Sequence, residues 1–302
     1  IHVLCAITVL AVLRRTPGWP AHTRAQTAWT PNVALSVALL WALHPLTSEC
    51  VNYLSQRTDS LMGLFCLLML YCAIRRFEGG TARWGIAAVV CCALGMGCKE
   101  SMVGAPLIVL LYDRAFFPCS FFAALRRRPW LYGGLSATWL LVVRGLWAVP
   151  HGATVGLDLR VTPWEYTLNQ SQMLCTYLGR SLWPHPLVLD YGFVRDLSLA
   201  EVWLEVSVIV ALLALTGVAL WRWPSWGFVG AWFFVLLAPT SSFVPILTEV
   251  GAERRMYLPL LSVVVILVMA GRALLRHRRG RFVIVLFVGA GLDDVGAQSR
   301  LP

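Results

Sequence analysis

Charged residues are scarce in this sequence. They make up 13% of its 302 residues, whereas 58% are apolar, and the mean hydropathy is +0.70. This balance excludes an ordinary soluble globular domain, in which about 25% of residues are charged. Lysine is almost absent, since Lys99 is the only one among 25 basic residues. The net charge of +10 is spread between apolar runs instead of forming one patch, which argues against nucleic-acid binding.

Metal-binding and disulfide patterns are also missing. The nine cysteines show no CxxC or CxxH spacing, and most lie inside apolar runs, where they usually act as small apolar side chains. A disulfide from Cys50 to Cys98 or Cys175 is conceivable, but no spacing requires it. Because the histidines show no HxH or HxxxH spacing, we predict no metal and no other cofactor, and a divalent ion stays open.

The sequence starts at Ile1 with no methionine and no signal peptide, and it holds no internal repeat. Its first apolar run is too short to cross a bilayer, which takes ~20 residues. We therefore expect a transmembrane domain over residues 1–292, truncated at its N-terminus, and a truncated polar tail over residues 293–302.

Apolar segments are abundant, and ten can be marked. They predict an all-α polytopic membrane protein with about ten transmembrane or membrane-inserted helices and further interfacial helices on its outer face. The segments are residues 3–13, 31–43, 60–74, 84–98, 102–111, 130–149, 202–220, 228–237, 257–270 and 282–292.

The loops between these segments separate the charges by sign. If residues 14–28 are cytoplasmic, most of the basic residues fall on that side, with only Glu78 and Asp113 among the acids. We interpret the short basic loops, including Arg126 to Arg128 and the phenylalanines before them, as lipid anchors. The pattern predicts an integral protein of the bacterial inner membrane or the endoplasmic reticulum membrane, with its active face periplasmic or lumenal.

The outer side carries long mixed segments. Residues 164–183 fit a helix lying on the membrane surface, with Trp164 and Trp183 as interface anchors. Residues 239–260 contain prolines, glycine and hydroxyls, which predict irregular backbone packed against protein or a cavity.

The stretch HPLTSECVNYLSQRTDSL, residues 44–61, carries the densest group of polar side chains. If the chain is helical from Ser48 onward, one face holds a polar stripe, which must meet other helices or a water-filled cavity. Alternatively, Asp59 and Ser60 only cap the next helix, which leaves the other polar residues unexplained. We favour a cavity. The stripe comprises Glu49, Asn52, Tyr53, Gln56, Asp59 and Ser60, and Arg57 flanks it.

A second outer junction, GCKESMVGAPL, places Lys99 beside Glu100. Two partners stay open for Lys99: a carboxylate, from Glu49 or Asp59, and an anionic headgroup.

Arg254 and Arg255 form a third group on the outer side, where paired arginines run against the positive-inside bias and need an anion. Glu249 and Glu253 could supply it, but we favour a phosphate, which arginine binds through bidentate bonds.

These motifs together resemble a known family. Four motifs carry the resemblance, in this order: ALHPLTSECVNYLSQRTDSLMGLFCLLML, GMGCKESMVGAPLIVLLYDRAF, SLWPHPLVLDYG, and APTSSFVPI followed by AERRMYLPL. They are similar to the membrane half of the transmembrane and tetratricopeptide-repeat O-mannosyltransferases and their bacterial relatives. The similarity covers residues 2–270.

The resemblance implies a C-type membrane glycosyltransferase. Such enzymes move a sugar, mannose in this family, from a polyprenyl phosphate to an acceptor protein or glycan on the lumenal or periplasmic face. A carboxylate takes the acceptor proton while cationic groups stabilise the leaving phosphate. The catalytic acidic residue of the family lies in an outer loop ahead of the segment matching residues 1–13, so the activity of this chain by itself stays open.

The motif positions imply two sets of site residues. Donor-phosphate or site-shaping groups would be Arg57, Lys99, Arg254 and Arg255. Supporting acidic and polar groups would be Glu49, Asn52, Gln56, Asp59, Glu100, Asp190, Tyr191, Glu253 and Tyr257. The alternatives are a non-catalytic remnant of the fold and a membrane transporter or lipid scaffold, in which the charges would line a path through the membrane. The clustering of charges at outer helix ends favours the transferase.

Overall fold

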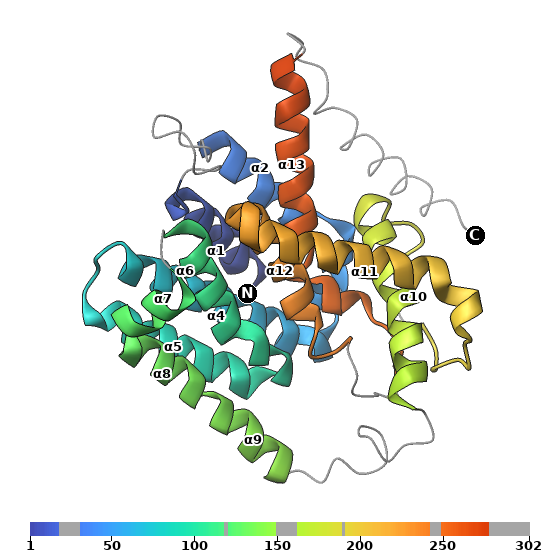
Figure 1. Cartoon of the computed structure of the whole chain (residues 1–302), viewed down its shortest axis with the longest axis horizontal. Helices are drawn as coiled ribbons and strands as arrows, with labels where there is room; N and C mark the ends of the chain where they lie inside the picture. The colour runs from blue at the N-terminus through green and yellow to red at the C-terminus, as the bar shows by residue number, and fades with distance from the viewer. Residues whose placement is uncertain (18–30, 118–119, 149–161, 189–190, 242–248, 278–302) are drawn as a thin grey trace.

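The computed structural model is built from α-helices and short 3-10 helices, as expected, with no strand in the residues that it describes (Figure 1). These are residues 1–17, 31–117, 120–148, 162–188, 191–241 and 249–277. In chain order the elements are α1 (His2–Arg15), α2 (Pro31–Ala42), η1 (Pro45–Thr47), α3 (Ser48–Asn52), η2 (Leu54–Gln56), α4 (Arg57–Phe77), α5 (Ala82–Cys98), η3 (Glu100–Gly104), α6 (Ala105–Phe116), α7 (Phe121–Arg127), α8 (Pro129–Ala137), α9 (Trp139–Ala148), α10 (Pro163–Leu182), α11 (Leu199–Arg222), α12 (Pro224–Leu237), η4 (Glu253–Met256) and α13 (Leu260–His277).

Charged and capping residues set several helix boundaries. α1, α4 and α11 carry arginines in their last turns, where a positive charge stabilises the carbonyl end of the helix dipole. α10 and α11 begin with capping boxes, Thr162 with Glu165 and Ser198 with Glu201. α10 confirms the helix predicted for residues 164–183, and Trp164 and Trp183 at its ends are exposed.

Fewer helices than expected could cross a membrane unaided. Two of the described helices are long and apolar enough, at Leu54–Phe77 and Leu199–Arg222, and up to four spans result if each of two bent helix pairs counts as one. α5, α12 and α13 are apolar but shorter. The segment at residues 282–292 lies outside the described residues. The about ten transmembrane or membrane-inserted helices expected from the sequence are therefore not confirmed, and the described residues contain two to four candidate spans.

The segment expected at residues 130–149 shows how an apolar run becomes two short helices. The run divides into α8 and α9 at Thr138. The Thr138 hydroxyl donates to the carbonyl of Leu135 at 2.6 Å and also meets the Cys92 thiol of α5. Hydroxyl groups bonded back to the preceding turn compete with the backbone ladder and bend helices. A hydropathy pattern does not include this competition, so it predicted one continuous segment.

The core is organised around α4, which packs against α1, α5 and α6. At one end of the bundle, two indoles attach the residues just before α13 to neighbouring helices. Trp41 of α2 donates to the Tyr257 carbonyl at 2.7 Å, and Trp232 of α12 donates to the Leu258 carbonyl at 2.9 Å. These bonds satisfy carbonyls at the irregular entrance to α13, where helix ladder bonds are incomplete.

Ion pairs among the described residues keep the two predicted charge groups apart. Arg15 pairs with Glu78 at 2.9 Å, and Arg128 pairs with the fully buried Asp113 at 2.8 Å. All four residues belong to the side predicted to be cytoplasmic. The remaining pairs join residues predicted to be on the outer side: Lys99 with Asp59, Arg254 with Glu49 and Glu249, and Arg255 with Glu249.

The described cysteines are free thiols, including Cys50, Cys98 and Cys175. The disulfide considered for Cys50 is therefore absent. Cys50 is buried, and its thiol instead donates to the backbone carbonyl of Arg254 at 3.7 Å.

The close approach of α11 and α12 depends on Gly227. A Cβ at this position would lie 2.3 Å from the backbone nitrogen of Leu220, which cannot move independently of α11. We expect Gly227→Ala to lower the midpoint of thermal unfolding in detergent micelles, by the equivalent of about 1–3 kcal/mol, because the two helices must separate.

Gly217 supplies the control, since it lies on the exposed side of α11 and a Cβ there meets open space. Gly217→Ala should leave the midpoint unchanged or raise it slightly, because alanine favours helix by up to about 1 kcal/mol. An unchanged midpoint for Gly227→Ala would contradict the proposed packing.

Candidate functional site

The predicted polar helix from Ser48 onward is interrupted. Tyr53 has extended backbone angles, φ −89° and ψ 118°, and it separates α3 from η2 and α4. The single polar stripe is therefore wrong, because a break in the helix resets the rotation of every later side chain. Asn52 and Arg57 are exposed, Gln56 is half-buried, and Asp59 is buried.

The capping alternative for this stretch is not observed either. α4 begins after Gln56 with no side-chain cap bond. The Ser60 hydroxyl donates to the Arg57 carbonyl at 3.0 Å, and one oxygen of Asp59 accepts from Lys99. Asp59 therefore serves an ion pair between two junctions of the chain, not the helix end.

Glu49 and Arg254 connect the first junction to the third. One Glu49 oxygen accepts from the guanidinium of Arg254 at 2.9 Å, and the other accepts from the backbone N–H of Arg254 at 2.7 Å. The guanidinium also donates to the carboxylate of Glu249. The Glu49 side chain is 9% exposed and that of Arg254 is 18% exposed. Carboxylates of the protein thus neutralise Arg254, where the sequence alone favoured a phosphate.

Lys99 and Asp59 connect the second junction to the first. Lys99 Nζ lies 2.5 Å from one oxygen of Asp59, and the lysine side chain is 29% exposed while the aspartate side chain is 5% exposed. The second Asp59 oxygen and the nearby Ser101 hydroxyl are buried without a hydrogen-bond partner among the described residues. Buried polar atoms of this kind usually bind a water or a ligand.

Arg255 is bound mainly by backbone. Its guanidinium donates to the carbonyls of Thr240, Val250 and Glu249, at 3.1, 3.3 and 3.1 Å, and its side chain is 6% exposed. The backbone here is irregular, as predicted: only the 3-10 helix η4 is regular between residue 249 and α13. Arg255 therefore fixes the shape of this stretch.

Glu253 holds the loop after α10. Its carboxylate accepts from the N–H of Val188 at 2.8 Å and from the hydroxyl of Tyr191 at 3.2 Å. Burial, together with the charge of the adjacent Glu253 carboxylate, raises the pKa of Tyr191 to about 12. Asp190, the other predicted residue of this loop, lies outside the described residues.

Tyr257 joins the site to the core. Its hydroxyl lies 2.8 Å from Nδ1 of His2, and its ring packs against those of His2 and Trp41. Glu100 begins η3, where it is exposed and does not line the pocket described next.

A polar pocket of about 20 Å³ lies where these junctions meet. Of the predicted site residues it brings together Asp59, Lys99, Arg254, Arg255 and Tyr257. Ser101 and Thr240 also line it, along with Met62, Leu236, Leu258 and Pro259. Ser101 was missed, although its position two residues after Lys99 was a signal that could have identified it.

The pocket has the volume of about one water molecule, which the unpaired oxygens of Asp59 and Ser101 could bind. Three cations and one carboxylate, Asp59, line it, and the carboxylates of Glu49 and Glu249, which pair with Arg254, bring the charges to balance. No group of three or more histidine, cysteine or acidic residues with metal-binding geometry occurs in the described parts of the chain.

The Glu49–Arg254 pair should contribute far more to stability than an exposed pair. We expect Glu49→Gln to lower the free energy of unfolding by about 1.5–3 kcal/mol, because the largely buried guanidinium loses one of its two carboxylates. Denaturation in mixed micelles, in a double-mutant cycle with Arg254→Gln, measures the coupling. Glu78→Gln is the control, since the Arg15–Glu78 side chains are 35% and 33% exposed and such pairs contribute about 0–1 kcal/mol. Equal losses for Glu49→Gln and Glu78→Gln would disprove the assignment.

Glu253 should make stability depend on pH. Burial raises the pKa of its carboxyl, with the bonds from Val188 and Tyr191 acting in the opposite direction. Because the folded pKa exceeds the unfolded value of ~4.3, this contribution is present below the unfolded pKa and is lost as pH rises through the folded pKa. The midpoint of thermal unfolding of Glu253→Gln should therefore increase relative to that of wild type as pH rises above ~4.3. The amide oxygen of the glutamine can accept the same two hydrogen bonds and carries no charge. A pH-independent difference between the two proteins would refute this.

In comparisons with known proteins, no family model, no curated protein and no solved structure matches this chain.

Proposed function

We propose that this chain is the membrane domain of a C-type glycosyltransferase, which binds a polyprenyl-phosphate sugar at the polar pocket. The observation that carries the proposal is the gathering of Lys99, Arg254 and Arg255, from separate junctions, around one pocket at one end of the helix bundle. The order of the sequence motifs supports the same function. The sugar, mannose in the family resembled, would pass to an acceptor protein or glycan.

The location in this proposal is a membrane, with the pocket on the periplasmic or lumenal side. The apolar surface supports it: the most apolar part of α11 has a mean hydropathy of 2.2, and only 17% of it is buried against the rest of the chain. Trp203, Val210 and Trp221 are among its exposed side chains. Lipid is the solvent in which such a surface is stable. The arginine-rich ends of α1, α4 and α11 would face the cytoplasm.

The three cations have different roles in this proposal. Lys99 is the most exposed of them and would meet the donor phosphate first. Arg254 would follow with a bidentate contact, exchanging one carboxylate for the phosphate. Arg255 would stay on its backbone carbonyls and act as a positioning residue. A phosphate is larger than the present pocket, so its binding requires the Lys99 and Arg254 side chains to move outward.

The proposed chemistry is displacement at the anomeric carbon with inversion. The acceptor oxygen attacks, its proton passes to a carboxylate, and the polyprenyl phosphate leaves with the electron pair of the broken bond. Charge then grows on the phosphate oxygens, where Lys99 and Arg254 would stabilise it. Following the resemblance, the proton acceptor would be an acidic residue of an outer loop.

Binding of a radiolabelled polyprenyl-phosphate mannose to the chain in nanodiscs tests this function. The informative variant is Lys99→Gln with Asp59→Asn, which removes both charges together and leaves no buried carboxylate unpaired. We expect it to bind the donor at least about tenfold more weakly, because a hydrogen bond to a charged group contributes about 1.5–3 kcal/mol.

Arg57→Gln is the matched control, because Arg57 is close in sequence but exposed and outside the pocket. It should bind the donor as wild type does. Wild-type affinity in the double variant, or an equal loss in Arg57→Gln, would reject the pocket as the phosphate site. Release of polyprenyl phosphate on addition of an acceptor peptide would separate an active transferase from a remnant that only binds.

A further inference from the structure

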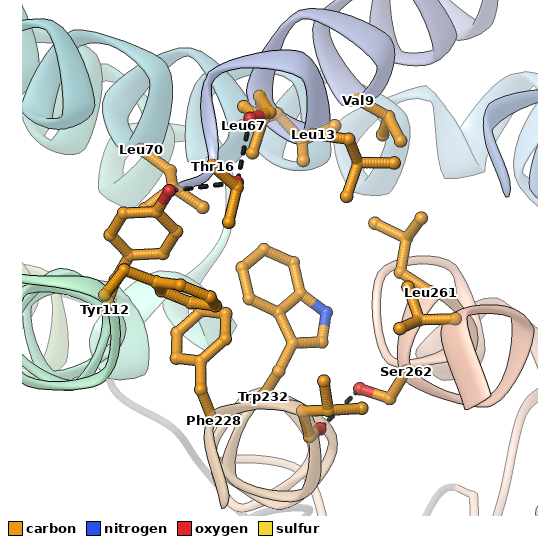
Figure 2. A pocket seen from close by; sticks show the side chains of 14 residues that line it. Val9, Leu13, Thr16, Leu67, Leu70, Tyr112, Phe228, Trp232, Leu261 and Ser262 are labelled. Atoms are coloured by element: carbon orange, nitrogen blue, oxygen red, sulfur yellow. Dashed lines mark hydrogen bonds between the residues drawn. The ribbon is translucent and has the colours of Figure 1, made fainter. Parts of the chain in front are cut away.

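A second cavity, of about 70 Å³, lies in the bundle among α1, α4, α6, α12 and α13. Figure 2 shows the Trp232 indole projecting from α12 into its centre, with Tyr112 and Phe228 on one side and Leu261 on the other. Val9 of α1 and Leu67 of α4 close the far wall. Nearly all of the lining is hydrocarbon or aromatic carbon.

The few polar groups around this cavity already have partners. The Thr16 hydroxyl donates to the Val12 carbonyl at 2.9 Å and accepts from the Tyr112 hydroxyl at 2.9 Å. The Ser262 hydroxyl donates to the Val229 carbonyl at 2.7 Å (Figure 2). A buried water needs two to four polar partners, and the hydroxyl hydrogens here are already donated to other groups, which leaves only hydroxyl lone pairs as acceptors. The cavity therefore suits an apolar occupant.

The cavity lies next to the polar pocket, because α4 and α12 contribute residues to both. On α4, Asp59 and Met62 line the pocket and Leu67 lines the cavity; on α12, Leu236 lines the pocket and Trp232 the cavity. Four residues of helix advance ~6 Å, so the two spaces are about one turn apart. A polar, cationic space thus adjoins a hydrocarbon-lined one, as in sites for amphiphiles.

We propose that this cavity binds a segment of hydrocarbon chain from a membrane lipid. Apolar cavities bind such groups without any hydrogen bond: an engineered cavity of roughly 150 Å³ with a similar lining takes benzene or xenon. A chain segment would restore the dispersion contacts that an empty space forfeits. The inference rests on the membrane location proposed above and is independent of glycosyl transfer.

Photolabelling tests the proposal. The chain is placed in nanodiscs of phosphatidylcholine that carries a diazirine on one acyl chain, irradiated, and digested for mass spectrometry. We expect carbene adducts on buried lining residues such as Val9, Leu67 and Trp232, in addition to adducts on the exposed face of α11. Adducts confined to exposed side chains, both with this lipid and with the polyprenyl probe described below, would overturn the proposal.

A filled cavity provides the matched comparison. Val9→Phe should lose the adducts on Leu67 and Trp232, whereas Val210→Phe, on the exposed face of α11, should keep them. Val265→Leu fills less of the space and serves if Val9→Phe does not fold; it should reduce the same adducts. Wild-type labelling of the lining in a folded filled variant would also overturn the proposal.

A second probe, a polyprenyl phosphate with a diazirine in its chain, identifies the source of the hydrocarbon. Lining adducts from phosphatidylcholine indicate bulk lipid, and adducts from the polyprenyl probe alone indicate the chain of the proposed donor. Either supports a hydrocarbon site. The double variant Lys99→Gln with Asp59→Asn separates the two proposals. If it keeps the lining adducts from phosphatidylcholine and also binds the donor as wild type does, the phosphate site is rejected and the hydrocarbon site is retained.

Discussion

The contact between Glu49 and Arg254 is the interaction on which the outer end of this molecule depends. One carboxylate bonds both the guanidinium and the backbone N–H of a residue 205 positions away. The Cys50 thiol and the Trp41 indole add bonds from the same stretch to the backbone of Arg254 and Tyr257. Together they set α3 against η4, and the polar pocket exists because these two stretches are held together.

The balance of charges around the pocket follows from its burial. An unpaired cation in this environment would be costly, so Arg254 has two carboxylates, Lys99 has Asp59, and Arg255 has backbone carbonyls. Under the proposed function, an incoming phosphate would replace carboxylates that are already present, which would limit the net gain on binding and allow the product to be released.

Several expectations from the sequence agree with the structure because they depend on local chemistry. Helices form where apolar runs are long, arginines end them, and Thr162 and Ser198 begin two others through their side chains. The sequence also allowed the clustering of Asp59, Lys99, Arg254, Arg255 and Tyr257 to be predicted. Charged side chains at helix ends in an apolar chain are costly in lipid, so they face one another or a cavity. The roles of Asn52 and Arg57 were not predictable, because the extended backbone of Tyr53 turns them outward. The same holds for Glu253, whose acceptor oxygen is taken by the loop at Val188.

By itself, the sequence determined the all-helical class, the apolar surface and the placing of charged residues at helix ends, because composition and periodicity act within a segment of the chain. Tertiary structure decided which carboxylate neutralises which cation, and how many helices are long enough to cross a membrane. It also created the hydrocarbon-lined cavity, to which α1, α4, α6, α12 and α13 each contribute one wall. These features depend on residues tens to hundreds of positions apart, and their distances are fixed only when the helices pack.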